Sequence, residues 1–299
     1  MKWPASWPNP PRRLRRVTGL VLVDKPAGPT SFAVIRRLRP LLGGKVGHAG
    51  TLDPFATGLL LVLAGKATRL ATYLSGLDKS YRAEVQFGAV SSTLDPEGEI
   101  EPTAAVTDLA AVRAAAAGMT GTVMQQVPLA SAVRVAGERS YARMRRGETE
   151  APPPRPVTIE RLEVEAFDAA AQTAVIEVSC SKGTYVRQIA ADLGTATGAG
   201  AYCSELRRLS VGPFLVDDAG TPDEIAADPE GRWSRSPREA LPHLPERLLT
   251  GPERDAVLHG RALETGDATG LVRLVFEGEL VAVARPAEQG LQPVAVLGA

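Results

Sequence analysis

Residues 80–87 read Ser80-Tyr81-Arg82-Ala83-Glu84-Val85-Gln86-Phe87, and their apolar and polar side chains alternate. Because successive side chains of a strand point to opposite faces, this segment predicts a half-buried β-strand with one apolar face. The chain has 299 residues, of which 44% are hydrophobic and 23% are charged. This composition excludes a disordered or fibrous protein and is typical of a globular protein with a sizeable core.

Further strands and helices are expected on both sides of this segment. Short apolar runs bounded by Gly and Pro predict strands, and apolar spacings of three and four predict helices. Strands are expected at 19–26, 58–65, 157–166 and 173–180; helices are expected from Thr30 or Ser31 onward and at 67–75, 107–118 and 185–193; residues 43–58 are expected to form a long structured loop. Strands outnumber helices and the two alternate irregularly. The predicted fold class is therefore α+β with a mixed, largely antiparallel sheet.

The same patterns divide the chain into three parts. Residues 1–17 are rich in Pro and Arg without periodicity and predict a basic flexible arm. Residues 18–242 form the main domain, in which a basic segment at about 125–156 is expected to be an insertion. Residues 243–299 contain short apolar runs separated by Gly, which predict a small β-rich module.

Charge is unevenly distributed although the totals cancel at 34 Lys and Arg against 34 Asp and Glu. Residues 1–50 contain ten basic residues and one Asp, a net charge of +9, whereas residues 221–299 have a net charge of −5. A solvated surface would explain any single basic cluster. Several clusters rich in Arg together favour a polyanionic partner such as a nucleic acid.

The cysteines and the apolar runs point to a cytoplasmic location. Cys180 and Cys203 form neither a disulfide framework nor a CxxC pair, which favours a reducing compartment. The longest apolar runs, such as 59–65, end well short of the roughly 20 residues that a membrane-spanning helix needs. We therefore expect a cytoplasmic protein without a membrane span.

The motifs of several common enzyme classes are absent from the sequence. It contains no GxSxG elbow, no GxxxxGK[ST] phosphate loop and no GxGxxG opening a helix. The three histidines lie in unrelated contexts, so no metal site is expected: His48, His243 and His259. A carboxylate that acts as nucleophile or base without a cofactor is the chemistry that remains.

Asp53 is the candidate for that carboxylate. It follows a Gly-rich segment, precedes Pro54, and is the only acidic residue between Asp24 and Asp78. A structural turn or cap would also explain an Asp-Pro pair. Nearby glycines allow close approach of a ligand to the backbone, and His48 offers a planar group for stacking.

Two further segments contain candidate partners for Asp53. Tyr81 lies on the apolar face of its expected strand, and the alternation by itself favours a role in the core. Tyr185 and Arg187 follow a Ser-Lys-Gly-Thr turn at the expected start of a helix, so they point in different directions. In that arrangement Arg187 can pair inward with a carboxylate while Tyr185 covers another group.

Together these segments resemble the bacterial tRNA pseudouridine-55 synthase (TruB) family. The segment Gly47-His48-Ala49-Gly50-Thr51-Leu52-Asp53-Pro54-Phe55-Ala56-Thr57-Gly58 resembles its catalytic motif. Five further segments resemble its other motifs in the same order: 19–31, 79–82, 131–147, 180–194 and 206–209. The resemblance spans roughly residues 18–215.

The resemblance implies a pseudouridine-synthase fold and an enzyme that isomerises uridine 55 of the tRNA T-loop. Asp53 would be the nucleophile, Tyr81 would stack on the flipped-out base, and Arg187 would pair with Asp53. His48 would stack on T-loop nucleotides. Pocket residues would be Tyr185 and Leu206, and phosphate contacts would come from Lys25, Lys66, Arg69 and the Arg143 of the insertion, which resembles the family's RNA-gripping thumb.

The resemblance also bears on cofactors and partners. No cofactor and no metal is implied, the partner is the T-arm of tRNA, and we expect a monomer without an obligate protein partner. Residues 243–299 resemble a reduced PUA-like module in placement, although their acidic balance disfavours phosphate binding. Two alternatives remain open: a tRNA-binding or tRNA-folding module in which catalysis is secondary, and a subunit guided by a separate RNA.

Overall fold

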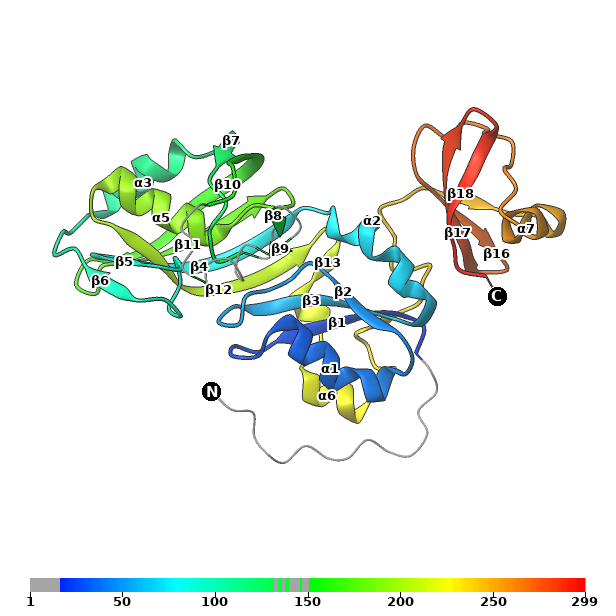
Figure 1. The fold of residues 1–299 in the computed structure, drawn as a ribbon, viewed down its shortest axis with the longest axis horizontal. Helices are drawn as coiled ribbons and strands as arrows, with labels where there is room; N and C mark the ends of the chain where they lie inside the picture. Colours follow the sequence, from blue (N-terminus) through cyan, green and yellow to red (C-terminus); the bar gives the residue numbers. More distant parts are fainter. Residues whose placement is uncertain (1–16, 132–133, 136–137, 140–145, 147–150, 299) are drawn as a thin grey trace. The chain divides into compact units, whose positions relative to one another are not determined.

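The computed structural model describes residues 17–131, 134–135, 138–139, 146 and 151–298. They divide into two units (Figure 1). Unit 1 comprises residues 1–53, 58–76 and 212–299, and unit 2 comprises residues 54–57 and 77–211. The predicted basic arm lies outside the described residues apart from Val17. Residues 132–133, 136–137, 140–145 and 147–150 of the predicted insertion lie outside them as well.

The core of unit 1 is an antiparallel pair of buried strands. β1 (Gly19–Lys25) pairs along its whole length with β3 (Thr57–Ala64), and β2 (Val46–Ala49) and β14 (Ser234–Arg235) extend the sheet on its two sides. Seven of the eight residues of β3 are buried, which matches its continuous run of Leu and Val.

Two helices of unit 1 lie together beside these strands (Figure 1). α1 (Ser31–Leu42) contacts β2, and α6 (Pro222–Ala227) contacts both β1 and α1. α1 begins where the sequence predicts, because the Thr30 hydroxyl accepts a hydrogen bond from the Ala33 amide and caps the helix.

The C-terminal part of unit 1 forms a separate small sheet. Its strand order is β15 (Glu246–Leu248), β16 (Val272–Phe276), β17 (Glu279–Ala287) and β18 (Gly290–Val296), with only the β15–β16 pairing parallel. α7 (Gly251–Leu258) packs on it and begins with a capping box between Thr250 and Glu253. The expected β-rich module is present, and the boundary at 242/243 stays a prediction.

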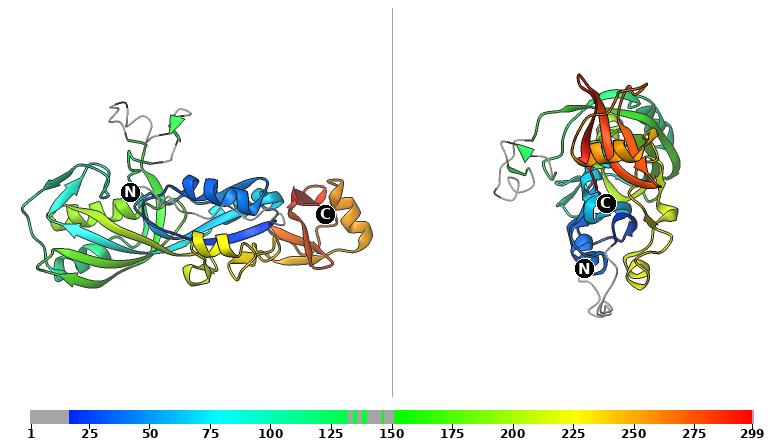
Figure 2. Two further views of the ribbon diagram at one scale, coloured as in Figure 1. Left: turned by 90° about the horizontal axis from the view of Figure 1, so that it is seen from below. Right: turned by 90° about the vertical axis from the view of Figure 1, so that its right-hand side faces the viewer.

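Unit 2 is built on a five-stranded antiparallel sheet. Its order is β12 (Ala201–Val211), β4 (Lys79–Phe87), β11 (Thr173–Cys180), β10 (Arg155–Asp168) and β7 (Gly121–Gln125). α5 (Val186–Thr197) packs on β12 and β4, and α3 (Leu109–Ala117) packs on β10 and on α5 (Figure 1 and Figure 2). The predicted α+β fold with a largely antiparallel sheet is confirmed.

The remaining elements are short. They are η1 (Gly65–Leu70), α2 (Ala71–Ser75), β5 (Ala89–Ser91), β6 (Ile100–Pro102), β8 (Arg134–Val135), β9 (Glu138–Arg139), β13 (Phe214–Leu215) and η2 (Val216–Asp218). Within the described part of the chain, none of the helices has the length and hydrophobicity that a membrane crossing requires.

Three local expectations differ from the structure. The expected loop at 43–58 contains strand β2, and the expected helix at 67–75 begins as the 3₁₀ helix η1 before it becomes α2. Strand β12 is not predicted at all. Two register shifts, at Cys203/Glu205 and Arg208/Ser210, break its alternation, because a bulge adds an unpaired residue to one strand.

Candidate active site

Asp53 lies in unit 1, four residues after β2 ends, and is half-buried. The preceding residue is held by the first residue of α1. The Ser31 hydroxyl donates to the Leu52 carbonyl oxygen at 3.0 Å and accepts from the Leu52 amide at 2.9 Å. Because the amide and the carbonyl of Leu52 are both hydrogen-bonded, the backbone position of the next residue, Asp53, is fixed relative to α1.

The loop around Asp53 has the backbone geometry that its glycines allow. Gly50 has a φ of 95°, in the left-handed region that residues with a Cβ rarely adopt. His48 lies on β2 opposite Val62 of β3 and is half-buried. The structure thus places His48 and Asp53 at the two ends of one short strand-to-loop segment of unit 1.

In unit 2, the strand pairing brings two predicted site residues to one face of the sheet. Leu206 of β12 is directly opposite Ala83 of β4, and Tyr81 lies two residues before Ala83. Residues two apart in a strand share a face, so Tyr81 and Leu206 do as well. The exposed fractions of Tyr81 and Leu206 are 8% and 7%, and Arg208, opposite Tyr81, is 1% exposed.

A buried cation lies beside Tyr81 on this face. Lys79 is 8% exposed, and its ammonium donates to the Leu77 carbonyl oxygen. Burial, followed by repulsion from Arg208, lowers the pKa of Lys79 to about 8. Burial likewise raises the pKa of the neighbouring Cys180 thiol to about 11, which keeps that thiol protonated at neutral pH.

Tyr185 and Arg187 lie at the start of α5 in unit 2. Tyr185 is the N-cap residue, with extended φ and ψ of −105° and 110°, and Arg187 lies in the first turn. Tyr185 is half-buried, whereas the exposed fraction of the Arg187 side chain is 2%. The two residues therefore lie at the start of one helix and differ in burial.

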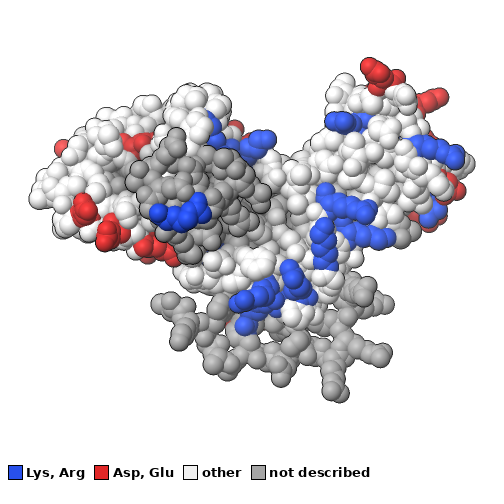
Figure 3. Space-filling view, viewed as in Figure 1, with Lys and Arg blue, Asp and Glu red and all other residues white. Residues whose placement is uncertain are grey.

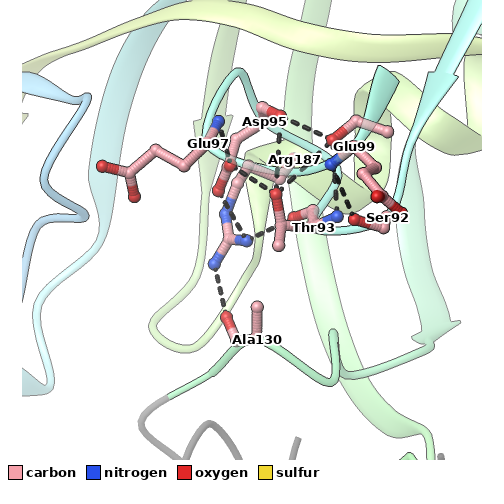
Figure 4. A network of polar contacts seen from close by, with 8 residues as sticks. Ser92, Thr93, Asp95, Glu97, Glu99, Ala130 and Arg187 are labelled. Atoms are coloured by element: carbon pink, nitrogen blue, oxygen red, sulfur yellow. Dashed lines mark hydrogen bonds and ion pairs between the residues drawn. The ribbon is translucent and has the colours of Figure 1, made fainter. Parts of the chain in front are cut away.

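Arg187 forms a buried ion pair with Asp95, a residue that the sequence analysis did not single out (Figure 4). Its Nη1 lies 3.0 Å from Asp95 Oδ2 and 2.6 Å from the Thr93 carbonyl oxygen, and its Nη2 lies 2.8 Å from the Ala130 carbonyl oxygen. Asp95 also accepts from the Thr93 hydroxyl at 2.6 Å and the Glu97 amide at 3.0 Å. A buried charge pair needs such additional hydrogen bonds to offset its desolvation.

The basic residues that were predicted to bind phosphates differ from one another in burial and in hydrogen-bond partners. Lys25 is fully buried and donates to the Pro26 carbonyl oxygen at 2.9 Å, so it presents no surface to a phosphate. Lys66 donates to the Gly298 carbonyl oxygen at 3.3 Å, and Arg69 donates to that of Val296, both in the C-terminal part of unit 1. Arg143 lies outside the described residues.

Other basic side chains of unit 1 are exposed. Figure 3 shows Lys and Arg gathered over α1 and over the η1–α2 segment. Arg36, Arg39 and Lys45 are exposed members of the α1 region. Among the residues that the structure describes, no three His, Cys, Asp or Glu side chains come together as metal ligands. The expectation that the protein needs neither a metal nor a cofactor stays a prediction.

Comparisons with known proteins show the family to which the chain belongs. Residues 38–186 match the family model described as TruB family pseudouridylate synthase (N terminal domain). The chain is 44% identical over 262 residues to the tRNA pseudouridine synthase B of Arthrobacter sp. (strain FB24), covering 85% of each chain. It is 42% identical over 290 residues to the tRNA pseudouridine synthase B of Thermobifida fusca (strain YX), covering 93% of this chain and 98% of the relative.

Among solved structures, a chain in the crystal structure of a Cbf5-Nop10-Gar1 complex has the same fold. The TM-score is 0.75 at 23% identity, over 99% of this chain and 91% of that chain. The sequence relationships are long and strong enough to assign the family. The chain belongs to the TruB family of pseudouridylate synthases.

Proposed function

We propose that this chain is a tRNA pseudouridine synthase that isomerises uridine 55 in the T-loop of tRNA to pseudouridine. The observation that carries the proposal is the similarity, over most of the chain, to enzymes named tRNA pseudouridine synthase B. The placement of Asp53 on a loop held by α1 supports it, because a nucleophile must keep its position through the reaction.

In the proposed reaction, Asp53 attacks the target uridine and the bond between N1 and the ribose C1′ breaks. The base rotates, C5 bonds to C1′, and the bond between Asp53 and the substrate breaks, which regenerates the carboxylate. The proton on C5 is lost while N1 gains one. Atoms balance within the substrate, so the reaction needs no oxidant, reductant or added group. Tyr81 would stack on the base, with Leu206 on the same face of the sheet as part of the pocket.

Arg187 would stabilise the ionised form of the nucleophile. A nearby guanidinium favours a charged carboxylate, and the charged form is the nucleophile. The pairing of Arg187 with Asp53 is proposed from the family resemblance; the ion pair with Asp95 supports it by holding the guanidinium in a defined orientation. We assign Asp95 to the active site for this reason.

For RNA binding we propose the exposed basic side chains of unit 1 and His48. The base must leave the T-loop to be reached, and stacking groups hold unstacked RNA bases. Lys66 and Arg69 stay in the proposal, because each donates to one backbone carbonyl and an ammonium or guanidinium has several donors. We leave the buried Lys25 out of the phosphate contacts. Residues 18–242 as catalytic domain, residues 243–299 as PUA-like module, a monomeric state and a cytoplasmic location belong to the same proposal.

The proposal is tested by incubating the purified protein with an unmodified tRNA transcript and no added metal or cofactor. We expect pseudouridine at the T-loop uridine and none in a transcript with cytidine at that position. Tight binding without conversion would contradict the proposed function and favour a tRNA-binding or tRNA-folding module.

A further inference from the structure

Two residues of unit 2 face each other where the predicted insertion leaves the sheet. Gln125 is the last residue of β7 and Arg155 is the first residue of β10, and they are direct cross-strand partners. Gln125 is 3% exposed and Arg155 is half-buried. Both contact the turn that leads into α5.

Gln125 binds both backbone groups of Tyr185. Its Oε1 accepts from the Tyr185 amide at 2.8 Å, and its Nε2 donates to the Tyr185 carbonyl oxygen at 3.0 Å. Only a side chain with a donor and an acceptor side by side can form this pair, and an amide has both. The same Tyr185 carbonyl accepts from the Gln188 and Ile189 amides, so the start of α5 is fixed together with Tyr185.

Arg155 contacts the side chain of the same residue. Its guanidinium carbon lies 5.0 Å from the centroid of the Tyr185 ring, within the range of a cation–π interaction. Its Nη2 also donates to the carbonyl oxygen of Gly183, two residues before Tyr185. The backbone of Tyr185 is thus held by one strand and its ring by the neighbouring strand.

We propose that Gln125 and Arg155 are positioning residues that set the orientation of the Tyr185 ring in the substrate pocket. The proposal rests on the proposed function, in which Tyr185 lines that pocket. Gln125 fixes the direction of the Tyr185 Cα–Cβ bond through the backbone. Arg155 selects one ring orientation by lying over its face.

Single-turnover rates at saturating enzyme separate positioning from binding. For Gln125→Met and Arg155→Met we expect a rate about 10- to 100-fold below wild type, the loss typical of misplaced catalytic groups, with the tRNA dissociation constant changed less than about twofold. The matched control is Gln126→Met. Gln126 is also a glutamine at the base of the insertion, but it donates to the Pro152 carbonyl oxygen at 2.7 Å and not to Tyr185. Its rate should remain within about twofold of wild type.

A double-mutant cycle tests whether the effect passes through the Tyr185 ring. In a Tyr185→Ala background, Gln125→Met and Arg155→Met should lower the rate further by less than about twofold. Full additivity would overturn the proposal, because a general structural role does not depend on the ring. If Gln125→Met does not fold, as judged by its urea midpoint, Gln125→Glu keeps the acceptor and loses the donor to the Tyr185 carbonyl.

A second readout does not depend on activity. The chain has five tyrosines, so 3-fluorotyrosine labelling gives five ¹⁹F signals, and Tyr185→Phe assigns one of them. We expect that signal to shift or broaden in Gln125→Met and Arg155→Met and to remain unchanged in Gln126→Met. An unchanged signal in the first two variants would overturn the proposal. Wild-type protein that fails to convert tRNA would overturn the proposed function alone, because the ¹⁹F comparison still reports on the ring.

Discussion

The Ser31 hydroxyl forms two hydrogen bonds with the backbone of Leu52, one as donor and one as acceptor. The exposed fractions of the two residues are 1% and 4%, so water cannot replace either bond. Leu52 directly precedes Asp53. The first turn of α1 therefore determines where the proposed nucleophile emerges from its loop.

Removing the Ser31 hydroxyl should impair catalysis more than removing the N-cap hydroxyl of the same helix. We expect Ser31→Ala to lower the single-turnover rate about tenfold and to destabilise the protein by about 1–3 kcal/mol, because two buried backbone groups lose their partner. Thr30→Ala is the matched control. It removes the N-cap bond to Ala33 at a cost of about 1 kcal/mol and leaves Leu52 untouched, so its rate should match wild type. Equal rates in both variants would contradict the positioning role of Ser31.

Breaking the buried ion pair between Asp95 and Arg187 should lower the free energy of unfolding far more than breaking an exposed pair. Asp95→Asn removes the carboxylate charge that faces the buried Arg187 guanidinium, and we expect a loss of about 3–5 kcal/mol in urea unfolding together with loss of activity. Glu163→Gln is the control. Its partner Arg161 lies 2.6 Å away, but both side chains are about half exposed, and we expect the urea midpoint of this variant to match that of wild type. Similar losses in the two variants would refute the assignment of Asp95 to the site.

Lys79 should make stability depend on pH in the alkaline range. Its pKa is about 8 in the folded protein and 10.5 ordinarily, so between these values the unfolded chain binds a proton that the folded chain has lost. The free energy of unfolding then rises with pH. Below about pH 7 Lys79 is protonated in both states and contributes no slope. The measurement is the free energy of unfolding of wild type minus that of Lys79→Met at each pH. We expect this difference to be constant up to pH 7 and to rise from about pH 8 to 10. A difference that is constant over the whole range would contradict the lowered pKa of Lys79.

The basic surface of α1 should appear in the salt dependence of tRNA binding. Each phosphate contact contributes about 0.7–0.9 to the slope of log affinity against log salt. Replacing the exposed Arg36 and Arg39 by Gln should therefore lower the slope by about 1.5. Arg113, exposed on α3 of unit 2, is the control position, and Arg113→Gln should leave the slope unchanged. If both variants keep the wild-type slope, α1 does not contact the RNA backbone.

Regular alternation made the strands of unit 2 predictable where the backbone is regular. β4 and β11 alternate buried and less buried residues along their lengths, and both were predicted within one residue of their bounds. β12 was missed because its bulges shift the alternation and because it places a fully buried cation, Arg208, where an apolar residue is expected. Propensity and periodicity do not encode such a tertiary requirement.

The site was predictable only in part for a related reason. Asp53 could be proposed from the sequence, because its Gly-rich neighbourhood and its family motif lie in contiguous residues. Asp95 precedes Pro96 in a run of small polar residues and has the signal of an ordinary turn. Its role depends on Arg187, which lies 92 positions away in sequence, and that of Gln125 depends on Tyr185, 60 positions away. Those contacts come from strand order and helix packing, which the local sequence does not specify.

The most direct test of the account compares wild type with Asp53→Asn on the same unmodified tRNA transcript. Asn keeps the size of the side chain but removes its negative charge and its nucleophilicity. We predict complete conversion at the T-loop uridine by wild type, no detectable pseudouridine with Asp53→Asn, and tRNA dissociation constants that agree within about threefold, since the carboxylate acts in the chemical step. Pseudouridine formation by Asp53→Asn at a rate near that of wild type would contradict the account.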